Sequence, residues 1–339
     1  MPKVVTRASQ VEIETAVQAL RDGNLVAFPT ETVYGLGANA KNPAAVRKIF
    51  EAKGRPTTHP VIVHLDSPRF LHHWVRELPE PASRLAEKFW PGPLTMVLPR
   101  AYNVDDILTG SQDTIAVRVP SHPMAQQLLT AFGGGIAAPS ANRYGRLSPT
   151  RAEHVRDELG DAVRVVLDGG ECQIGLESTI ISFGGGQVHL LRPGAVTAGQ
   201  IRQVIGELLL GADLESPRVP GSTPSHYSPQ TPMTIVPTGQ IDSLAAALSE
   251  GGRRIAVLAQ RLPLKAHSHV TWVNAGRRPE QYGHGLYANL RTLDKAGCRR
   301  ILVQEVPPDE RWDAVRDRLT RAASGIAAIA DTGAYAVMR

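Results

Sequence analysis

The strongest constraint on the fold of this chain is a change of composition at residues 211–232. This stretch, GADLESPRVPGSTPSHYSPQTP, is rich in Pro, Ser, Thr and Gly and has little periodic apolarity, which is typical of a linker. Its middle carries His226 and Tyr227. A chain of 339 residues is also too long for one ordinary domain. The sequence therefore predicts a domain over residues 1–210, a linker over 211–232 and a second domain over 233–339.

Short apolar runs mixed with helical patterns fill the segment before the linker. Ser9 and Glu12 have the spacing of a capping box, and Asn42 followed by Pro43 is typical of a helix start. The pattern predicts further helices over 67–76, 81–89, 122–133, 150–159 and 197–209, and strands over 25–29, 60–65, 94–99, 114–120, 135–142, 163–168, 178–183 and 187–193. Many short strands among helices predict one twisted, open α/β domain.

A simpler alternation of strands and helices follows the linker. Strands are expected over 233–237, 253–259, 269–275 and 299–306, and helices over 240–249, 279–296 and 309–323. Regular β/α alternation of this kind predicts a small open parallel sheet with a Rossmann-like layout. The sequence does not indicate the role of this second domain.

Several protein classes are disfavoured by the composition. The chain has no apolar run of about eighteen residues, the length that a membrane helix needs. Its first residues, MPKVVTRASQVEIE, lack the apolar core of a signal peptide. Cys172 and Cys298 are far apart and outside any metal-binding spacing, so a reducing cytoplasm is the expected setting. The net charge of +5 permits a phosphate-bearing ligand or weak RNA contact but does not require nucleic acid.

Positive charge gathers before one of the predicted strands, in FEAKGRPTTHPVIVHL. In an extended segment, Lys53 and Arg55 would point the same way, and Gly54 between them would let a ligand approach the backbone. Arginine offers a fork for phosphate oxygens and lysine a point charge. The alternative is a solvated basic turn at the end of a helix, where cations also favour the helix dipole.

Two further segments place small polar side chains at predicted strand ends. Ser140 and Asn142 follow an apolar strand, where open α/β sheets bind ligands, although Ser and Asn are also common turn residues. Thr30, Thr32 and Tyr34 supply hydroxyl groups to a ligand or to the end of their own strand. The nearby GLGANA loosely matches a dinucleotide-binding fingerprint, but no acidic residue follows at the required distance, so this match is discounted.

Two arginines lie within apolar stretches, where arginine is seldom buried unless it is paired. Arg118 ends the run TIAVRVP, and Arg192 precedes a Pro-Gly turn in LLRPGAV. They point to recognition of a carboxylate or phosphate, or to internal ion pairs. The chain contains no GxSxG, HExxH or CxxC motif, so the sequence indicates neither a serine hydrolase nor a zinc site.

Six motifs in one order resemble the threonylcarbamoyl-AMP synthases, a YrdC-like family, in their long two-domain form. They are PTETVYGLGANA, KGRPTTHPVIVHL, PSANRYGRLSPT, ESTII, LRPGAV and HYSP. The resemblance covers about residues 8–208 and continues through the linker into the C-terminal domain. It implies a YrdC-like catalytic domain followed by the Rossmann-like domain. The linker departs from the usual pattern with Met and Lys before the His-Tyr pair, because this chain reads PGSTPSHYSP there.

The resemblance also implies roles for individual residues. A catalytic tetrad would comprise Lys53, Arg55, Ser140 and Asn142. ATP would be bound by Arg55, His59, Thr114, Ser140, Ser148 and Arg192, with His226 and Tyr227 closing over the nucleotide from the linker. Threonine would be bound by Thr32, His64, Arg118 and Ser178. No metal ligands are expected in the protein, and Mg²⁺ would arrive on the ATP phosphates.

The implied reaction joins L-threonine, bicarbonate and ATP into threonylcarbamoyl adenylate and releases pyrophosphate. A downstream threonylcarbamoyl transferase complex would then move the product's acyl group to an adenosine of tRNA. Two other readings are a carbamoyl-adenylate transferase and a double-stranded RNA-binding module without turnover. The former is disfavoured because no acylphosphatase-like segment or zinc-finger cysteines accompany the domain, and the latter because the chain has no basic stripe.

Overall fold

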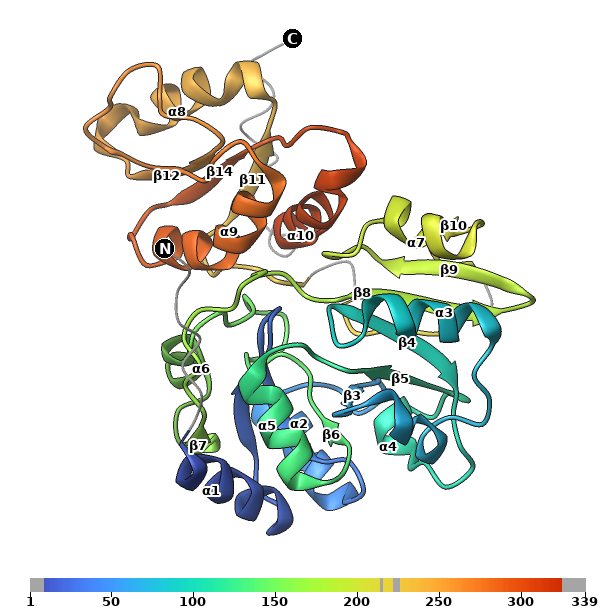
Figure 1. The fold of residues 1–339 in the computed structure, drawn as a ribbon. Helices are drawn as coiled ribbons and strands as arrows, with labels where there is room; N and C mark the ends of the chain where they lie inside the picture. The colour runs from blue at the N-terminus through green and yellow to red at the C-terminus, as the bar shows by residue number, and fades with distance from the viewer. Residues whose placement is uncertain (1–8, 214–215, 222–225, 325–339) are drawn as a thin grey trace. The chain divides into compact units, whose positions relative to one another are not determined.

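A computed structural model describes residues 9–213, 216–221 and 226–324 (Figure 1). The prediction that the chain has no signal peptide rests partly on residues 1–8, which lie outside the described residues. The chain forms two compact units, of which the first comprises residues 1–144 and 148–222. The second comprises residues 223–339 and, in addition, the short segment 145–147, which no sequence pattern had indicated.

A single mixed sheet runs through the first unit, with the strand order β10-β9-β8-β4-β5-β3-β6-β2-β1-β7. Its strands are β1 (Val26–Pro29), β2 (Tyr34–Asn39), β3 (Ile62–His64), β4 (Leu94–Pro99), β5 (Thr114–Arg118), β6 (Ile136–Ala137), β7 (Val165–Val166), β8 (Thr179–Gly184), β9 (Gln187–Arg192) and β10 (Leu209–Leu210). β3 and β5 are parallel, and β4 runs antiparallel to β5.

The helices of the first unit begin and end where the sequence supplies capping residues. Ser9 and Glu12 form the predicted capping box of α1, and Asn42 caps α2 just before Pro43. The helices are α1 (Gln10–Arg21), α2 (Pro43–Lys53), α3 (Glu80–Phe89), α4 (Asp106–Thr109), α5 (Pro123–Phe132), α6 (Ala152–Leu159) and α7 (Ala198–Ile205), with the 3₁₀ turns η1 (Pro68–His73) and η2 (Gly160–Ala162). The helix predicted over 67–76 is therefore a 3₁₀ turn.

Helices cover both faces of this sheet. Alternate residues of β1 point to opposite sides: Val26 and Phe28 pack with α1 and α5, whereas Ala27 packs with α2. The larger of the two cores also contains side chains of α3, α6 and α7. This arrangement confirms the predicted mixed α/β class and buries both faces of the central strands.

The second unit contains four parallel strands in the order β11-β14-β12-β13, which confirms the predicted small parallel sheet. The strands are β11 (Met233–Val236), β12 (Ile255–Ala259), β13 (Val270–Asn274) and β14 (Arg300–Gln304). The helices are α8 (Ile241–Ser249), α9 (Pro279–Asp294) and α10 (Asp313–Ala323), with the 3₁₀ turns η3 (Thr238–Gln240), η4 (Glu250–Gly252) and η5 (Glu310–Trp312). α8 lies on one side of the strands, and α9 and α10 lie on the other (Figure 1).

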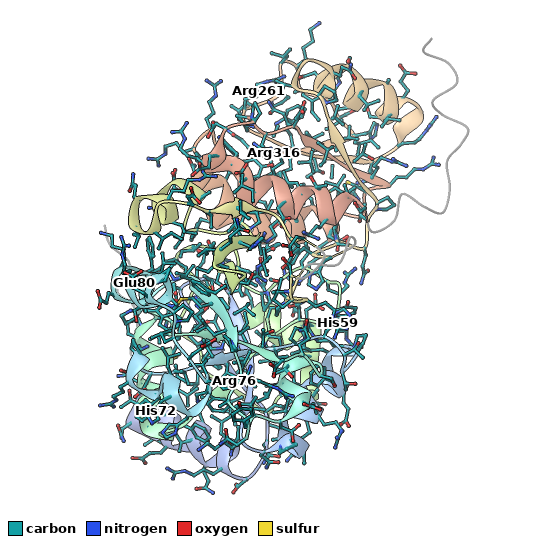
Figure 2. The ribbon with its side chains drawn as sticks, turned by 90° about the vertical axis from the view of Figure 1, so that its right-hand side faces the viewer. His59, His72, Arg76, Glu80, Arg261 and Arg316 are labelled. Carbon is teal, nitrogen blue, oxygen red and sulfur yellow. The ribbon has the colours of Figure 1, made fainter. Side chains whose placement is uncertain are left out.

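Two salt bridges of the second unit involve helices α8 and α10: one ties α8 to the loop after β12, and the other lies within α10. Arg261 pairs with Asp242 of α8, and Arg316 pairs with Asp313 of α10 (Figure 2). No helix among the described residues is long and apolar enough to cross a membrane.

Candidate active site

Lys53 joins the two halves of the predicted tetrad. Its ammonium group donates hydrogen bonds to the backbone carbonyls of Ser140 (2.6 Å) and Asn142 (2.5 Å). In return, the backbone N–H of Tyr144 donates to the Lys53 carbonyl over 2.7 Å. Burial, and secondly the charge of Arg55, place the pKa of Lys53 well below its usual range. The end of α2 and the loop after β6 therefore form one structure with a buried amine at its centre.

The local conformation around Gly54 differs from the predicted extended segment. Lys53 is the last residue of α2, and Gly54 ends the helix in the left-handed conformation, with φ at 62°. The glycine is needed for this backbone geometry, which costs other residues conformational strain. The solvated turn considered as the alternative is also wrong, because Lys53 and Arg55 are only 3% and 7% exposed.

Arg55 packs against the Tyr144 ring, which in turn contacts His59. Its guanidinium donates to the Pro60 carbonyl over 2.8 Å and lies 5.8 Å from the centre of the Tyr144 ring. The Tyr144 hydroxyl and Nδ1 of His59 (labelled in Figure 2) are 3.3 Å apart. Burial and the charge of Arg55 lower the pKa of His59. Sequence reasoning missed Tyr144, although it lies within the motif PSANRYGRLSPT.

A second polar group forms where β5 ends. The Arg118 guanidinium donates to the Thr32 hydroxyl (2.9 Å), the Gly92 carbonyl (3.2 Å) and the Glu31 carboxylate (2.6 Å). The Thr32 hydroxyl is also 2.7 Å from that of Thr30. Two predicted threonine-binding residues, Thr32 and Arg118, therefore touch each other. Glu31 had not been predicted, although it lies within the motif PTETVYGLGANA.

His64 is the residue of β3 paired with Arg118 of β5. Its side chain is buried, and the described part of the chain offers its Nδ1 atom no hydrogen-bond partner. Burial, and secondly the charge of Arg118, lower the pKa of His64 from 6.5 to about 3. The imidazole is therefore neutral near neutral pH.

Ser178 and Arg192 are held together at the start of β8. Arg192 donates from Nε and Nη2 to the Ser178 carbonyl, over 3.1 and 2.8 Å, and from Nη2 to the Ser178 hydroxyl over 3.2 Å. Its Nη1 donates to the Pro220 carbonyl over 2.8 Å. The Ser178 hydroxyl also lies 2.7 Å from that of Thr95, a β4 residue that sequence reasoning missed. Residues predicted for ATP and for threonine thus share one network.

The remaining predicted residues lie in three places. The buried Ser148 hydroxyl donates to the Glu177 carboxylate over 2.5 Å, and Glu177 was not predicted. Thr114 begins β5, and its buried hydroxyl has no hydrogen-bond partner among the described residues. His226 and Tyr227 belong to the second unit, where their rings pack with centres 4.2 Å apart.

Tyr227 is fixed within the second unit by unusual backbone and side-chain geometry. Its φ of 61° lies in the left-handed region, which non-glycine residues rarely adopt. Its ring is 1% exposed, lies 5.9 Å from the Tyr287 ring and carries the Arg318 guanidinium at 5.2 Å. The predicted closing of Tyr227 over a nucleotide remains a proposal.

The groups of Lys53 and Arg118 are connected through the backbone. Ser140 forms a bridge to Gly35, and the N–H of Ala141 donates to the Tyr34 carbonyl over 2.9 Å. The turn that carries Thr32 precedes these residues directly. The loop held by Lys53 therefore lies against the beginning of β2, next to the turn that follows β1. The polar group around Lys53 and the one around Arg118 are thus brought to one region of the sheet.

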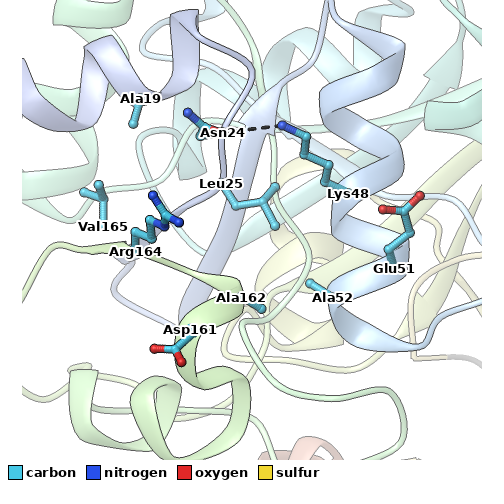
Figure 3. Close-up of a pocket in the computed structure, with 10 residues that line it drawn as sticks. All are labelled: Ala19, Asn24, Leu25, Lys48, Glu51, Ala52, Asp161, Ala162, Arg164 and Val165. Carbon is cyan, nitrogen blue, oxygen red and sulfur yellow. Dashed lines mark hydrogen bonds between the residues drawn. The ribbon is translucent and has the colours of Figure 1, made fainter.

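A pocket of about 390 Å³ lies elsewhere on the first unit (Figure 3). It is lined by Ala19, Asn24, Leu25, Lys48, Glu51, Ala52, Asp161, Ala162, Arg164 and Val165. Lys48 donates to the Gly23 carbonyl over 2.7 Å at its edge. None of the predicted site residues lines this pocket, so we place the candidate active site on the buried polar groups instead.

The described residues show no grouping of carboxylates and histidines that would hold a metal. Within residues 9–213, 216–221 and 226–324, no three or more His, Cys, Asp or Glu side chains are arranged to hold a metal ion. The arrangement instead offers hydrogen-bond donors and positive charge, which suits anionic groups such as carboxylates and phosphates.

Because His64 is buried in its neutral form, we predict that the free energy of unfolding depends on pH. The folded-state pKa of about 3 lies below the unfolded value of 6.5, so the unfolded chain takes up this proton first as pH falls. Between about pH 7 and about pH 5, the free energy of unfolding should fall by about 2 kcal/mol through this group alone. Urea denaturation of the wild type and His64→Gln at both pH values should show a smaller fall in the variant. Equal falls would contradict the prediction.

Two family models match successive parts of this chain. Residues 18–194 match a family model for Sua5, YciO and YrdC proteins, described as telomere recombination. Residues 196–324 match a model described as the threonylcarbamoyl-AMP synthase C-terminal domain.

Similar proteins match over almost the whole chain. A threonylcarbamoyl-AMP synthase of Pyrococcus abyssi is 39% identical over 93% of this chain and 95% of its own length. One of Bacillus subtilis is 41% identical over 93% of each chain. The crystal structure of P. abyssi Sua5 complexed with L-threonine superposes with a TM-score of 0.88 at 38% identity, covering 94% of this chain and 96% of that one. This chain therefore belongs to the threonylcarbamoyl-AMP synthase family, in its long form with a C-terminal domain.

Proposed function

We propose that this protein condenses L-threonine, bicarbonate and ATP into threonylcarbamoyl adenylate and releases pyrophosphate. The observation that carries the proposal is the burial of four cations in the first unit. These four basic residues are each at most 7% exposed: Lys53, Arg55, Arg118 and Arg192. The relative from P. abyssi was crystallised with L-threonine, which supports the amino-acid substrate.

The chemistry needs positive charge more than it needs a nucleophile. The amine of threonine would add to bicarbonate, with loss of water, and form a carbamate. A carbamate oxygen would then bond to the α-phosphorus of ATP while the bond to pyrophosphate breaks. Both reactants are anions, so the protein must position them and screen their charge. Buried guanidinium and ammonium groups perform this task without a covalent intermediate.

The two polar groups divide the substrates between them. Arg118, Thr32, Ser178 and the neutral His64 would bind threonine, because a guanidinium fork fits a carboxylate and hydroxyls fit its side chain. Lys53, Arg55, His59 and Arg192 would face ATP, together with Thr114 and Ser148. Ser140 and Asn142 would join the two sets through the loop that Lys53 holds. Mg²⁺ would be held mainly by the ATP phosphates.

An omission assay tests this function directly. Purified protein is supplied with ATP, L-threonine and bicarbonate, and pyrophosphate is measured with each component left out in turn. We expect pyrophosphate release only in the complete mixture, and mass spectrometry should identify threonylcarbamoyl adenylate. Replacing threonine and bicarbonate by carbamoyl phosphate should yield no adenylate. Release that does not depend on threonine would overturn the proposal.

The product would serve the next enzyme rather than accumulate. An acyl adenylate is a reactive anhydride, so it must pass to an acceptor before water destroys it. We propose that a threonylcarbamoyl transferase complex takes up the product and modifies an adenosine of tRNA.

A further inference from the structure

A buried carboxylate accompanies the arginine that we assign to threonine. Oε1 of Glu31 lies 2.6 Å from Nη2 of Arg118, and the two side chains are 3% and 4% exposed, respectively. The second carboxylate oxygen of Glu31 accepts a hydrogen bond from the Ser121 N–H over 3.0 Å. A charge pair this deeply buried is costly to form, because both ions leave water. An arginine that only had to bind an anion would not need this partner.

The described contacts of Arg118 do not use all of its hydrogen-bond donors. A guanidinium has five N–H donors, and the described contacts use one on each of its three nitrogens. One N–H therefore remains on each terminal nitrogen, which is the number that a bidentate carboxylate accepts. Glu31 thus neutralises Arg118 without using all of its donors.

The net charge of a ligand should therefore decide how well it binds beside the Arg118–Glu31 pair, even among ligands of the same shape. Arg118 and Glu31 together carry no net charge, and burial lowers the pKa of both His64 and His122 beside them, so these rings are neutral near neutral pH. A free amino acid is a zwitterion and also carries no net charge. An anion of the same shape would add an unpaired negative charge next to Glu31 in a medium of low dielectric constant.

We propose that Glu31 is a specificity-determining residue, whose carboxylate neutralises Arg118 so that the threonine subsite prefers a zwitterionic amino acid to a carboxylate without an ammonium group. This inference rests on the proposed function, in which Arg118 faces the threonine carboxylate. It adds a reason why an acid stands beside that arginine.

The test compares two ligands of similar shape by isothermal titration. One is L-threonine, and the other is its α-hydroxy analogue, in which a hydroxyl replaces the ammonium. The wild type should prefer threonine by at least about tenfold, and Glu31→Gln should reduce that preference by at least about tenfold. Glu31→Asp keeps the charge and should keep the preference. Asp242→Asn removes a carboxylate from an arginine pair in the second unit and serves as the matched control.

The possible outcomes separate the two proposals. If the wild type binds no threonine, the proposed function fails. If it binds threonine but also binds the anionic analogue equally well, the role of Glu31 is refuted without any variant, which covers the case that Glu31→Gln does not fold. An unchanged preference in a folded Glu31→Gln variant also overturns the inference and leaves the proposed function intact.

Discussion

Replacing Lys53 with alanine is expected to lower the rate of threonylcarbamoyl adenylate formation by at least about a hundredfold, the usual cost of losing a preorganised charge. The Lys53 ammonium is buried and holds the carbonyls of Ser140 and Asn142 within 2.6 Å. Alanine removes the charge and leaves two carbonyls without this donor. The loop that joins both polar groups then loses its side-chain attachment to α2 and keeps the backbone hydrogen bond from Tyr144 to residue 53.

The measurement is pyrophosphate release in the complete mixture, with circular dichroism to confirm that the variant is folded. Lys48→Ala is the matched control, because Lys48 lies on the same helix (Figure 3) and also donates to a backbone carbonyl, that of Gly23. It lines the separate pocket and contacts no predicted site residue. We expect the control to retain wild-type activity, and Arg55→Ala to be as inactive as Lys53→Ala. Full activity in folded Lys53→Ala would remove this lysine from the catalytic site.

The periodicity of apolar residues was sufficient to predict the class of each domain. The capping box of α1 and the start of α2 were correct to the residue, because side-chain caps act over three or four positions. The parallel sheet of the second unit followed from its regular alternation. Both depend on short-range patterns that a single sequence contains.

Strand β2 was missed for a physical reason. Its sequence, YGLGAN, contains two glycines and therefore resembles a turn. In the sheet, a Cβ atom on Gly37 would lie 2.9 Å from both Phe28 and Ile136 side-chain atoms. Glycine is thus required by neighbours on strands β1 and β6, and a local pattern carries no information about such neighbours.

In the candidate site as well, the sequence identified individual residues but not their contacts with distant residues. Motifs identified Lys53 and Arg118, but their partners come from other parts of the chain. Glu31 and Glu177 lie within two of the six motifs, but the sequence does not show which residues they contact, Arg118 and Ser148 respectively. The sheet order brings those partners together.

The last prediction concerns Arg192, which we expect to be irreplaceable even by lysine. Its guanidinium makes two hydrogen bonds to the Ser178 carbonyl, one to the Ser178 hydroxyl and one to the Pro220 carbonyl. Lysine has a single point charge and cannot span these acceptors, which lie on segments far apart in sequence. Arg192→Lys should therefore lower the free energy of unfolding by about 3 kcal/mol, since buried carbonyls lose their donors.

Urea denaturation at neutral pH measures this loss, and the same samples are assayed for pyrophosphate release. Arg76→Lys is the control, because Arg76 (labelled in Figure 2) forms a surface ion pair with Asp113, whose side chain is 70% exposed. Such a pair contributes little, so this variant should stay within about 0.5 kcal/mol of the wild type. If Arg192→Lys were equally stable and active, the guanidinium fork would have no structural role. A stable but inactive variant would instead indicate that Arg192 acts only in substrate binding, because the structure at the start of β8 would then not depend on the guanidinium.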